Sequence, residues 1–142
     1  MDKPMEQMLR EYRSNRDEIV ELQQKLRELP GSESLIGNSV VLDYRRGYPQ
    51  PRSIVGYDHG LEERRRERWT KRIELLQAEV DAVERWIEAI PDGVTRRIFR
   101  MYYCEGIKQE KIGQKLHMDR SRVSRKMDKF LKNAQKAQKA QV

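Results

Sequence analysis

Apolar residues in the first thirty positions recur at alternating steps of four and three, the period of a helix that packs along one seam. The seam residues are Met8, Tyr12, Asn15, Ile19, Leu22, Leu26 and Leu29. Pro4 suits the first turn of a helix, where its missing N–H is no loss, and Pro30-Gly31 should end the helix. The pattern therefore predicts a long helix from Pro4 to Leu29.

A second seam with the same steps predicts another long helix, which should end near Ala89-Ile90 because Pro91 follows. Its seam residues are Trp69, Ile73, Leu76, Val80, Val83, Ile87 and Ile90. The two helices can pair as an antiparallel hairpin or with a second copy of the chain. Asn15, the one polar seam residue, should either fix the register by bonding a partner amide or lie in solvent near a frayed end.

The connection between the helices, residues 30–60, is longer than most loops and rich in glycine, proline and tyrosine. Ser39–Tyr44 is β-branched enough for a short strand, and Ser53–Tyr57 is a candidate partner across a turn. Such a ribbon could be an arm that reaches DNA or a partner, or only a folded connector. The candidate contact residues on the arm are Arg45, Arg46 and Arg52.

The pattern of apolar residues in the last third of the chain predicts shorter helices. Asp92 can cap a helix from Val94 to Glu105, and Gly106 is placed to end it. Its inward residues should be Val94, Ile98, Met101 and Tyr102. A short helix, Lys108–Leu116, follows, with Ile112 and Leu116 on one face. A three-residue turn, His117-Met118-Asp119, leads to a basic helix whose inward residues should be Val123, Met127, Phe130 and Leu131. Short helix, tight turn and longer basic helix form a helix-turn-helix.

Three residues of this segment suit a helix-turn-helix for specific physical reasons. Gly113 lacks a side chain that would hold the two helices apart. Met118 should fill the corner between the helices, and Asp119 can accept backbone N–H bonds at the start of the basic helix. The first turns of that helix would then be free to enter the major groove, where arginine bonds guanine and serine bonds bases or phosphate.

Composition and charge agree with a helical DNA-binding protein. The chain has 142 residues, enough for one ordinary domain or a small domain with an extended helical element. Charged residues make up 37 %, against a usual ~25 %, so a broad buried core is excluded. The net charge is −1 in residues 1–58, −1 in residues 59–91 and +9 in residues 92–142, which gives +7 in all. An excess confined to one segment is typical of a nucleic-acid-binding unit, whereas a solvated lysine tail would not explain the internal arginines.

The candidate contact residues follow from this placement. The base-reading candidates are Arg120, Ser121, Arg122, Ser124 and Arg125. The phosphate candidates are Lys108, Gln109, Lys126, Lys129 and Lys132. The alternative is a three-helix bundle whose arginines are only solvated.

Catalytic and metal sites are not expected. His59 and His117 each lack a spaced second ligand, and no phosphate loop or nucleophile motif occurs. Cys104, the single cysteine, is expected in the core; it suits a reducing compartment. No cofactor is expected. There is no run of ~18 apolar residues for a membrane span and no signal peptide, so we expect a cytoplasmic protein.

Residues 90–131, above all Tyr103–Arg125, resemble the promoter-reading region 4 of bacterial sigma factors. A helical pair before such a unit is similar in layout to the phage ArpU/RinA-type transcriptional regulators of Gram-positive bacteria. The resemblance implies that Arg120, Ser121, Arg122, Ser124 and Arg125 face the major groove. The family commonly has Ser or Thr where this chain has Lys108, and glycine where it has His117. Histidine is among the residues enriched at positive φ, so we expect His117 to adopt the turn conformation.

The sequence therefore predicts an all-α protein in which a helical hairpin or coiled coil, residues 1–91, provides assembly. Residues 92–133 would be the helix-turn-helix domain and residues 134–142 a basic tail. We expect a sequence-specific transcriptional regulator, phage- or prophage-encoded, that binds double-stranded DNA. RNA polymerase and a second copy of the chain are further candidate partners. The alternative is a small-terminase-like component of DNA packaging, which also joins a helix-turn-helix to oligomerising helices.

Overall fold

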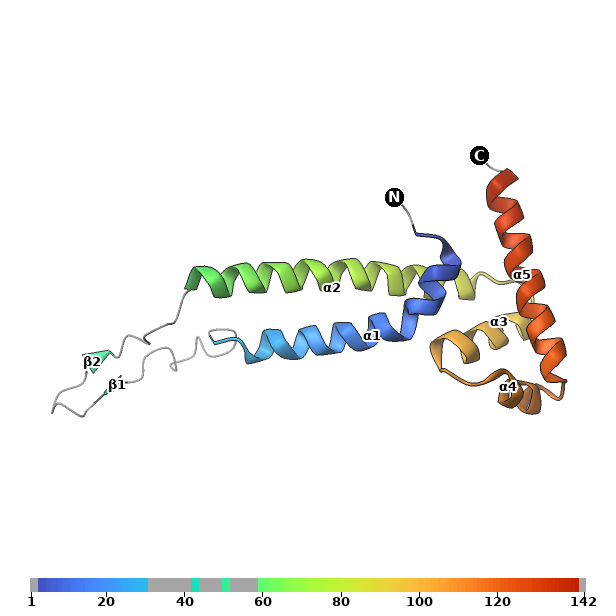
Figure 1. Cartoon of the computed structure of the whole chain (residues 1–142), viewed down its shortest axis with the longest axis horizontal. Helices are drawn as coiled ribbons and strands as arrows, with labels where there is room; N and C mark the ends of the chain where they lie inside the picture. The colour runs from blue at the N-terminus through green and yellow to red at the C-terminus, as the bar shows by residue number, and fades with distance from the viewer. Residues whose placement is uncertain (1–2, 31–41, 44–49, 52–58, 141–142) are drawn as a thin grey trace. The chain divides into compact units, whose positions relative to one another are not determined.

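The computed structural model describes residues 3–30, 42–43, 50–51 and 59–140, and the fold is all-α as predicted (Figure 1). The elements in order are α1 (Met5–Glu28), β1 (Leu42–Asp43), β2 (Gln50–Pro51), α2 (His59–Glu88), α3 (Gly93–Phe99), η1 (Arg100–Cys104), α4 (Gln109–Leu116) and α5 (Arg120–Ala140). Two compact units divide the chain. The first unit contains Met1–Asp17 and Gln77–Val142, and the second unit is Glu18–Leu76. The helix-turn-helix segment therefore belongs to the same unit as the first turns of α1 and the end of α2.

Helices α1 and α2 form the antiparallel hairpin that was one of the two predicted pairings (Figure 1). Most seam residues of the first unit are buried: Tyr12, Asn15, Val80, Val83, Ile87 and Ile90. Asn15 is buried and donates from Nδ2 to Glu79 Oε2 at 3.2 Å, so it is not solvated and its partner is a carboxylate in place of an amide. The Tyr12 hydroxyl donates to Glu84 Oε1 at 2.6 Å, and burial raises the pKa of this phenol. These two bonds fix the register of the hairpin within the first unit.

The second unit continues the same pairing with other contacts. Ile19, Leu22 and Leu76 are buried seam residues, and Arg72 Nε lies 2.9 Å from Glu18 Oε2. The Lys25 ammonium lies 5.8 Å from the centre of the Trp69 ring.

The connection contains a two-residue antiparallel ladder in which Leu42 pairs with Pro51 and Asp43 with Gln50. The first strand falls within the predicted Ser39–Tyr44, but its partner comes earlier than predicted, within the predicted turn. The predicted strand at 53–57 and the arm residues Arg45, Arg46 and Arg52 lie outside the described residues.

The third helix begins and ends as predicted but changes its winding in between. The Asp92 carboxylate caps α3, accepting from Thr95 N at 3.1 Å and Thr95 Oγ1 at 2.6 Å. The last turn, η1, is a π-helical turn closed by the bond from Glu105 N to Arg100 O, and Gly106 follows at φ +71°. The extra residue per turn shifts the face that points inward. Tyr102, which we expected inward, is exposed, whereas Phe99 is fully buried.

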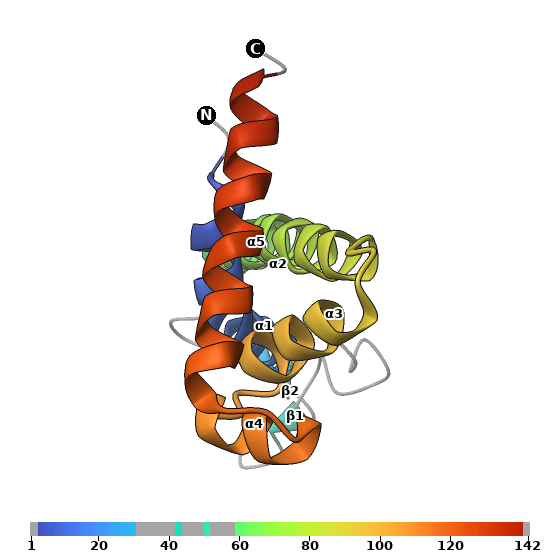
Figure 2. The same ribbon diagram turned by 90° about the vertical axis from the view of Figure 1, so that its right-hand side faces the viewer.

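An aromatic cluster joins α5 to the rest of the first unit. Trp86 of α2 contacts Phe99 of α3 and Phe130 of α5 edge to face, with ring centres 5.5 and 5.4 Å apart. Phe99 and Phe130 contact each other at 5.5 Å. The second half of α5 also meets the start of α1, where Gln135 Nε2 donates to Glu6 Oε2 at 3.2 Å. Helix α5 is therefore held at one end by the hairpin and at the other by α4 (Figure 2).

We expect the contact between Trp86 and Phe130 to contribute to stability beyond the area that it buries. In urea denaturation, Phe130→Ala should lower the free energy of unfolding by roughly 2–4 kcal/mol because it removes a half-buried ring from the aromatic cluster. A double-mutant cycle with Trp86→Ala should give a coupling energy of about 1 kcal/mol, which is typical of an aromatic pair. Strictly additive losses would contradict this account of the cluster.

Candidate nucleic-acid interface

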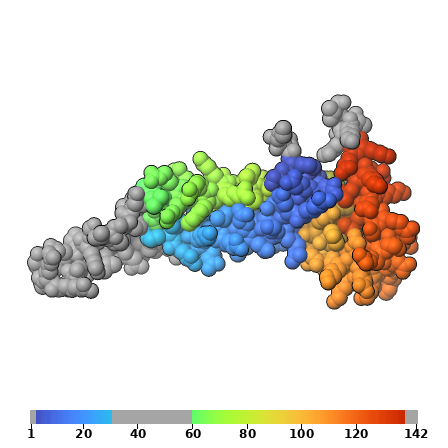
Figure 3. Space-filling view, in the orientation of Figure 1, coloured from blue at the N-terminus to red at the C-terminus, as the bar shows by residue number. Residues whose placement is uncertain are grey.

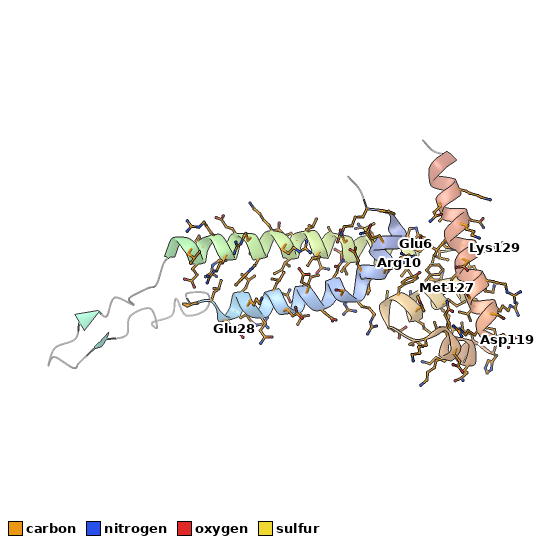
Figure 4. All side chains as sticks on the ribbon, in the orientation of Figure 1. Glu6, Arg10, Glu28, Asp119, Met127 and Lys129 are labelled. Atoms are coloured by element: carbon orange, nitrogen blue, oxygen red, sulfur yellow. The ribbon has the colours of Figure 1, made fainter. Side chains whose placement is uncertain are left out.

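Helices α4 and α5 and the turn between them form the predicted helix-turn-helix (Figure 2). Ile112 of α4 packs against α5, where Val123 and Met127 are the buried residues of the first two turns. Gln109 Nε2 lies 3.5 Å from the sulfur of Met127 and adds a weak hydrogen bond between the helices. In Figure 4, Met127 and Lys129 are labelled on opposite sides of α5, so the helix has one buried and one open face.

The turn depends on a backbone conformation that few side chains adopt. His117 has φ +57° and ψ +48°, in the left-handed region, as we expected for a histidine in the place of glycine. Its N–H donates to the carbonyl of Gly113, and Met118 N donates to the same oxygen at 2.9 Å. These two bonds end α4 and turn the chain within three residues.

Gly113 allows this turn because it has no side chain. A Cβ atom at this position would lie 2.5 Å from the carbonyl oxygen of Met118 and 3.5 Å from the backbone N of Arg120. The prediction that a small residue is needed here is confirmed. The group that it accommodates is the backbone of the turn.

Neither α4 nor α5 begins with a side-chain cap, although one was expected from Asp119 at the start of α5. The backbone carbonyl of Asp119 accepts from Arg122 N at 3.0 Å and from Val123 N at 3.1 Å. The hydrogen bonds found in the described part of the chain include none to the Asp119 carboxylate, so the expected side-chain cap is not formed. Lys108 precedes α4 in an extended conformation, and its side chain makes no capping bond. The backbone N–H groups in the first turn of α4 thus have no intrahelical acceptor, as at any helix start.

The base-reading candidates lie on the first two turns of α5. Four of them are exposed, and Ser124 is half-buried; the exposed four are Arg120, Ser121, Arg122 and Arg125. Arg125 Nε donates to the carbonyl of Ser121 at 3.3 Å, so this guanidinium folds back along its own helix. Within the described residues, no carboxylate oxygen lies within 4 Å of the three guanidinium groups. The three guanidinium groups are therefore outside ion-pair distance of the described carboxylates, although Glu110 and Asp119 line the same concave surface as Arg120 and Arg122.

The phosphate candidates divide into two groups. Lys108, Lys129 and Lys132 are exposed, and the two lysines of α5 lie on the same open face as Arg125. Gln109 and Lys126 are half-buried: the Gln109 amide faces Met127, and Lys126 lies near Asp92. The pKa of Asp92 is lowered mainly because Thr95 donates to its carboxylate, and the charge of Lys126 lowers it further.

The first unit also has a concave surface that was not predicted. It lies between α1 and the segment from η1 to α4, and its polar lining residues include Arg10, Arg13, Tyr102, Tyr103 and Lys108. It has no recognisable sequence pattern, because Arg10 and Arg13 lie outside the predicted seam of α1. Only the fold brings them beside Lys108.

Other chemistry has little support among the described residues. They contain no group of three or more His, Cys, Asp or Glu side chains that could hold a metal ion. Cys104 is half-buried, and burial raises the pKa of its thiol, which disfavours the reactive thiolate. None of the described helices has a stretch apolar and long enough to cross a membrane.

Comparisons with known proteins give no assignment: no family model, curated protein or solved structure matches the chain.

We expect His117 to cost stability in the turn. His117→Gly should raise the free energy of unfolding by about 1 kcal/mol, because glycine adopts positive φ without steric strain. His117→Val should lower it, since a β-branched residue is strained there. Equilibrium urea denaturation measures both, and equal stabilities of the two variants would contradict the left-handed conformation.

We expect Gly113→Ala to destabilise the protein by roughly 1–3 kcal/mol, the usual cost of overpacking. Alanine otherwise favours helices over glycine by about 1 kcal/mol, so a loss would report the contact with the Met118 carbonyl. Gly93→Ala is the matched control, because a Cβ there meets only the end of the Arg96 side chain at an ordinary 3.6 Å. If both variants gain stability, the close approach at Gly113 is wrong.

Proposed function

We propose that the protein is a sequence-specific DNA-binding transcriptional regulator that reads the major groove with the start of α5. The observation that carries this proposal is the exposed cluster of Arg120, Arg122 and Arg125 at the end of a tightly turned helix pair. An α-helix fits the major groove, and arginine makes bidentate bonds to the O6 and N7 atoms of guanine. The resemblance to sigma factor region 4 supports the same use of this helix.

The two sets of cations on α5 have different tasks in this proposal. Only the first turns of a helix about 31 Å long can enter the groove, so Arg122 and Arg125 are placed to meet base edges. Lys129 and Lys132 continue the same face one and two turns further on, where the phosphates of the groove wall would lie. Lys108 and the free N–H groups at the start of α4 are suited to another phosphate.

The structure of the first unit also favours a defined orientation on DNA. The C-terminal half of α5 is held by Trp86 and by the bond from Gln135 to Glu6. A helix that is clamped by the hairpin presents its arginines in one direction, and such preorganisation is what discrimination between base pairs requires. A solvated helix in a loose bundle would have no such restraint.

We expect alanine substitutions to separate base reading from phosphate binding. Arg122→Ala or Arg125→Ala should cost about 1–3 kcal/mol on the preferred sequence and relax the preference at one or two base pairs. Lys132→Ala, the control on the same helix, should weaken binding to all sequences alike and reduce the salt slope by about one. The measurement is selection from a randomised duplex pool for each full-length variant.

The outcome also decides between two functions. If the arginine variants lose affinity evenly over every sequence, α5 binds only the backbone and the regulator proposal fails. A non-specific packaging or architectural role, like that of a small terminase subunit, would then account for the charge.

A further inference from the structure

A basic and aromatic groove lies in the first unit, on the side of α1. It is lined by Arg10 and Arg13 of α1, by Tyr102 and Tyr103 of η1, and by Gly106 and Lys108 of the connection to α4. Figure 3 shows the α1 residues, in blue, directly against the orange segment that leads to α4. We call this surface the α1 groove.

Arg13 is seated in the α1 groove by a glycine. Gly106 has φ +71°, and a Cβ atom there would collide with the guanidinium of Arg13. The guanidinium therefore lies directly on the backbone of Gly106, in the space that any other residue would fill. Gly106, two positions before Lys108, thus leaves the space in which the Arg13 guanidinium lies.

The charges of the α1 groove are only partly neutralised. Arg10 Nη2 lies 2.8 Å from Glu6 Oε1, and Figure 4 labels both on the first turns of α1. For Arg13 and Lys108, no carboxylate oxygen of the described residues lies within 4 Å. Tyr102 is 37 % exposed and adds an aromatic ring and a hydroxyl to the lining of the same groove.

We propose that the α1 groove binds the sugar–phosphate backbone of duplex DNA that flanks the segment read by α5. This inference rests on the proposed function. Lys108 belongs both to the groove and to the phosphate contact proposed at the start of α4, because it precedes the first turn of α4 and also lines the groove. Arginine, lysine and tyrosine side chains are common donors to phosphate oxygens, and such contacts set the position of a protein on DNA. The hairpin would then be part of the DNA interface.

An acidic protein segment is the other occupant with matching charge. Continuity with the start of α4 favours DNA. A DNA strand that passes Lys108 could reach Arg13 along the groove, and the described residues that line the groove include no carboxylate that would repel its phosphates. The test below separates the two occupants.

The test uses the full chain and the preferred sequence from the selection experiment, as a duplex of about 11 base pairs and as one of about 30, which adds flanking turns. Arg13→Ala should weaken binding to the long duplex about tenfold, the usual value of a charged hydrogen bond, and reduce its salt slope by about one. Binding to the short duplex should change less than about twofold. Arg27→Ala is the matched control, since it removes the same charge from α1 outside the groove.

Gly106→Ala is a second variant that removes no charge. It should weaken binding to the long duplex because it displaces Arg13, while circular dichroism checks that the helices remain. If Arg13→Ala and Arg27→Ala bind the long duplex alike, the groove proposal is overturned although DNA reading stands. If the wild-type protein binds neither duplex, the proposed function itself fails. Tighter binding of a poly-glutamate peptide than of the long duplex at equal salt would also overturn the groove proposal, in favour of a protein partner.

Discussion

The contact of Trp86 with Phe99 and Phe130 is the interaction on which the arrangement of the first unit depends. Three aromatic rings from α2, α3 and α5 meet edge to face within 5.4–5.5 Å. Each such ring buries a large apolar area, and a chain with only 7 % aromatic residues has few others to replace them. Because Phe130 lies halfway along α5, this contact fixes where the charged start of that helix points.

The rest of the candidate interface follows from backbone geometry. Gly113 lets the turn approach α4, and His117 adopts a left-handed conformation to make that turn. The arginines of α5 then lie outside the packed face because Val123 and Met127 occupy it. A hairpin clamp at one end and a tight turn at the other make α5 a rigid support for its exposed side chains.

Much of this arrangement could be predicted from periodicity. The two heptad seams predicted two long helices that each pack along one apolar stripe, and the hairpin was one of the two pairings that this pattern allowed. The roles of Gly113 and Asp92 could also be predicted. Only a small residue leaves room for a close approach at Gly113, and an aspartate at Asp92 can accept backbone N–H bonds at the start of a helix. The position of His117 followed from the resemblance together with the tolerance of histidine for positive φ.

Other features gave no readable signal. Trp86 is adjacent to the seam residue Ile87, and only the presence of α3 and α5 makes its face an interior one. The π turn at Arg100–Cys104 has no sequence pattern of its own, so the exposure of Tyr102 was not predicted. The seating of Arg13 on Gly106 joins residues more than ninety positions apart, and such contacts depend on the whole fold.

Methylation interference on the preferred duplex tests most directly whether α5 enters the major groove. Methyl groups on guanine N7 lie in the major groove, whereas those on adenine N3 lie in the minor groove, so one experiment probes both sides. We expect N7 methylation at one or two guanines to block binding of the wild-type protein, and the block at one of them to disappear with Arg125→Ala. Interference only at adenine N3, or at no base, would contradict the claim that this helix reads sequence.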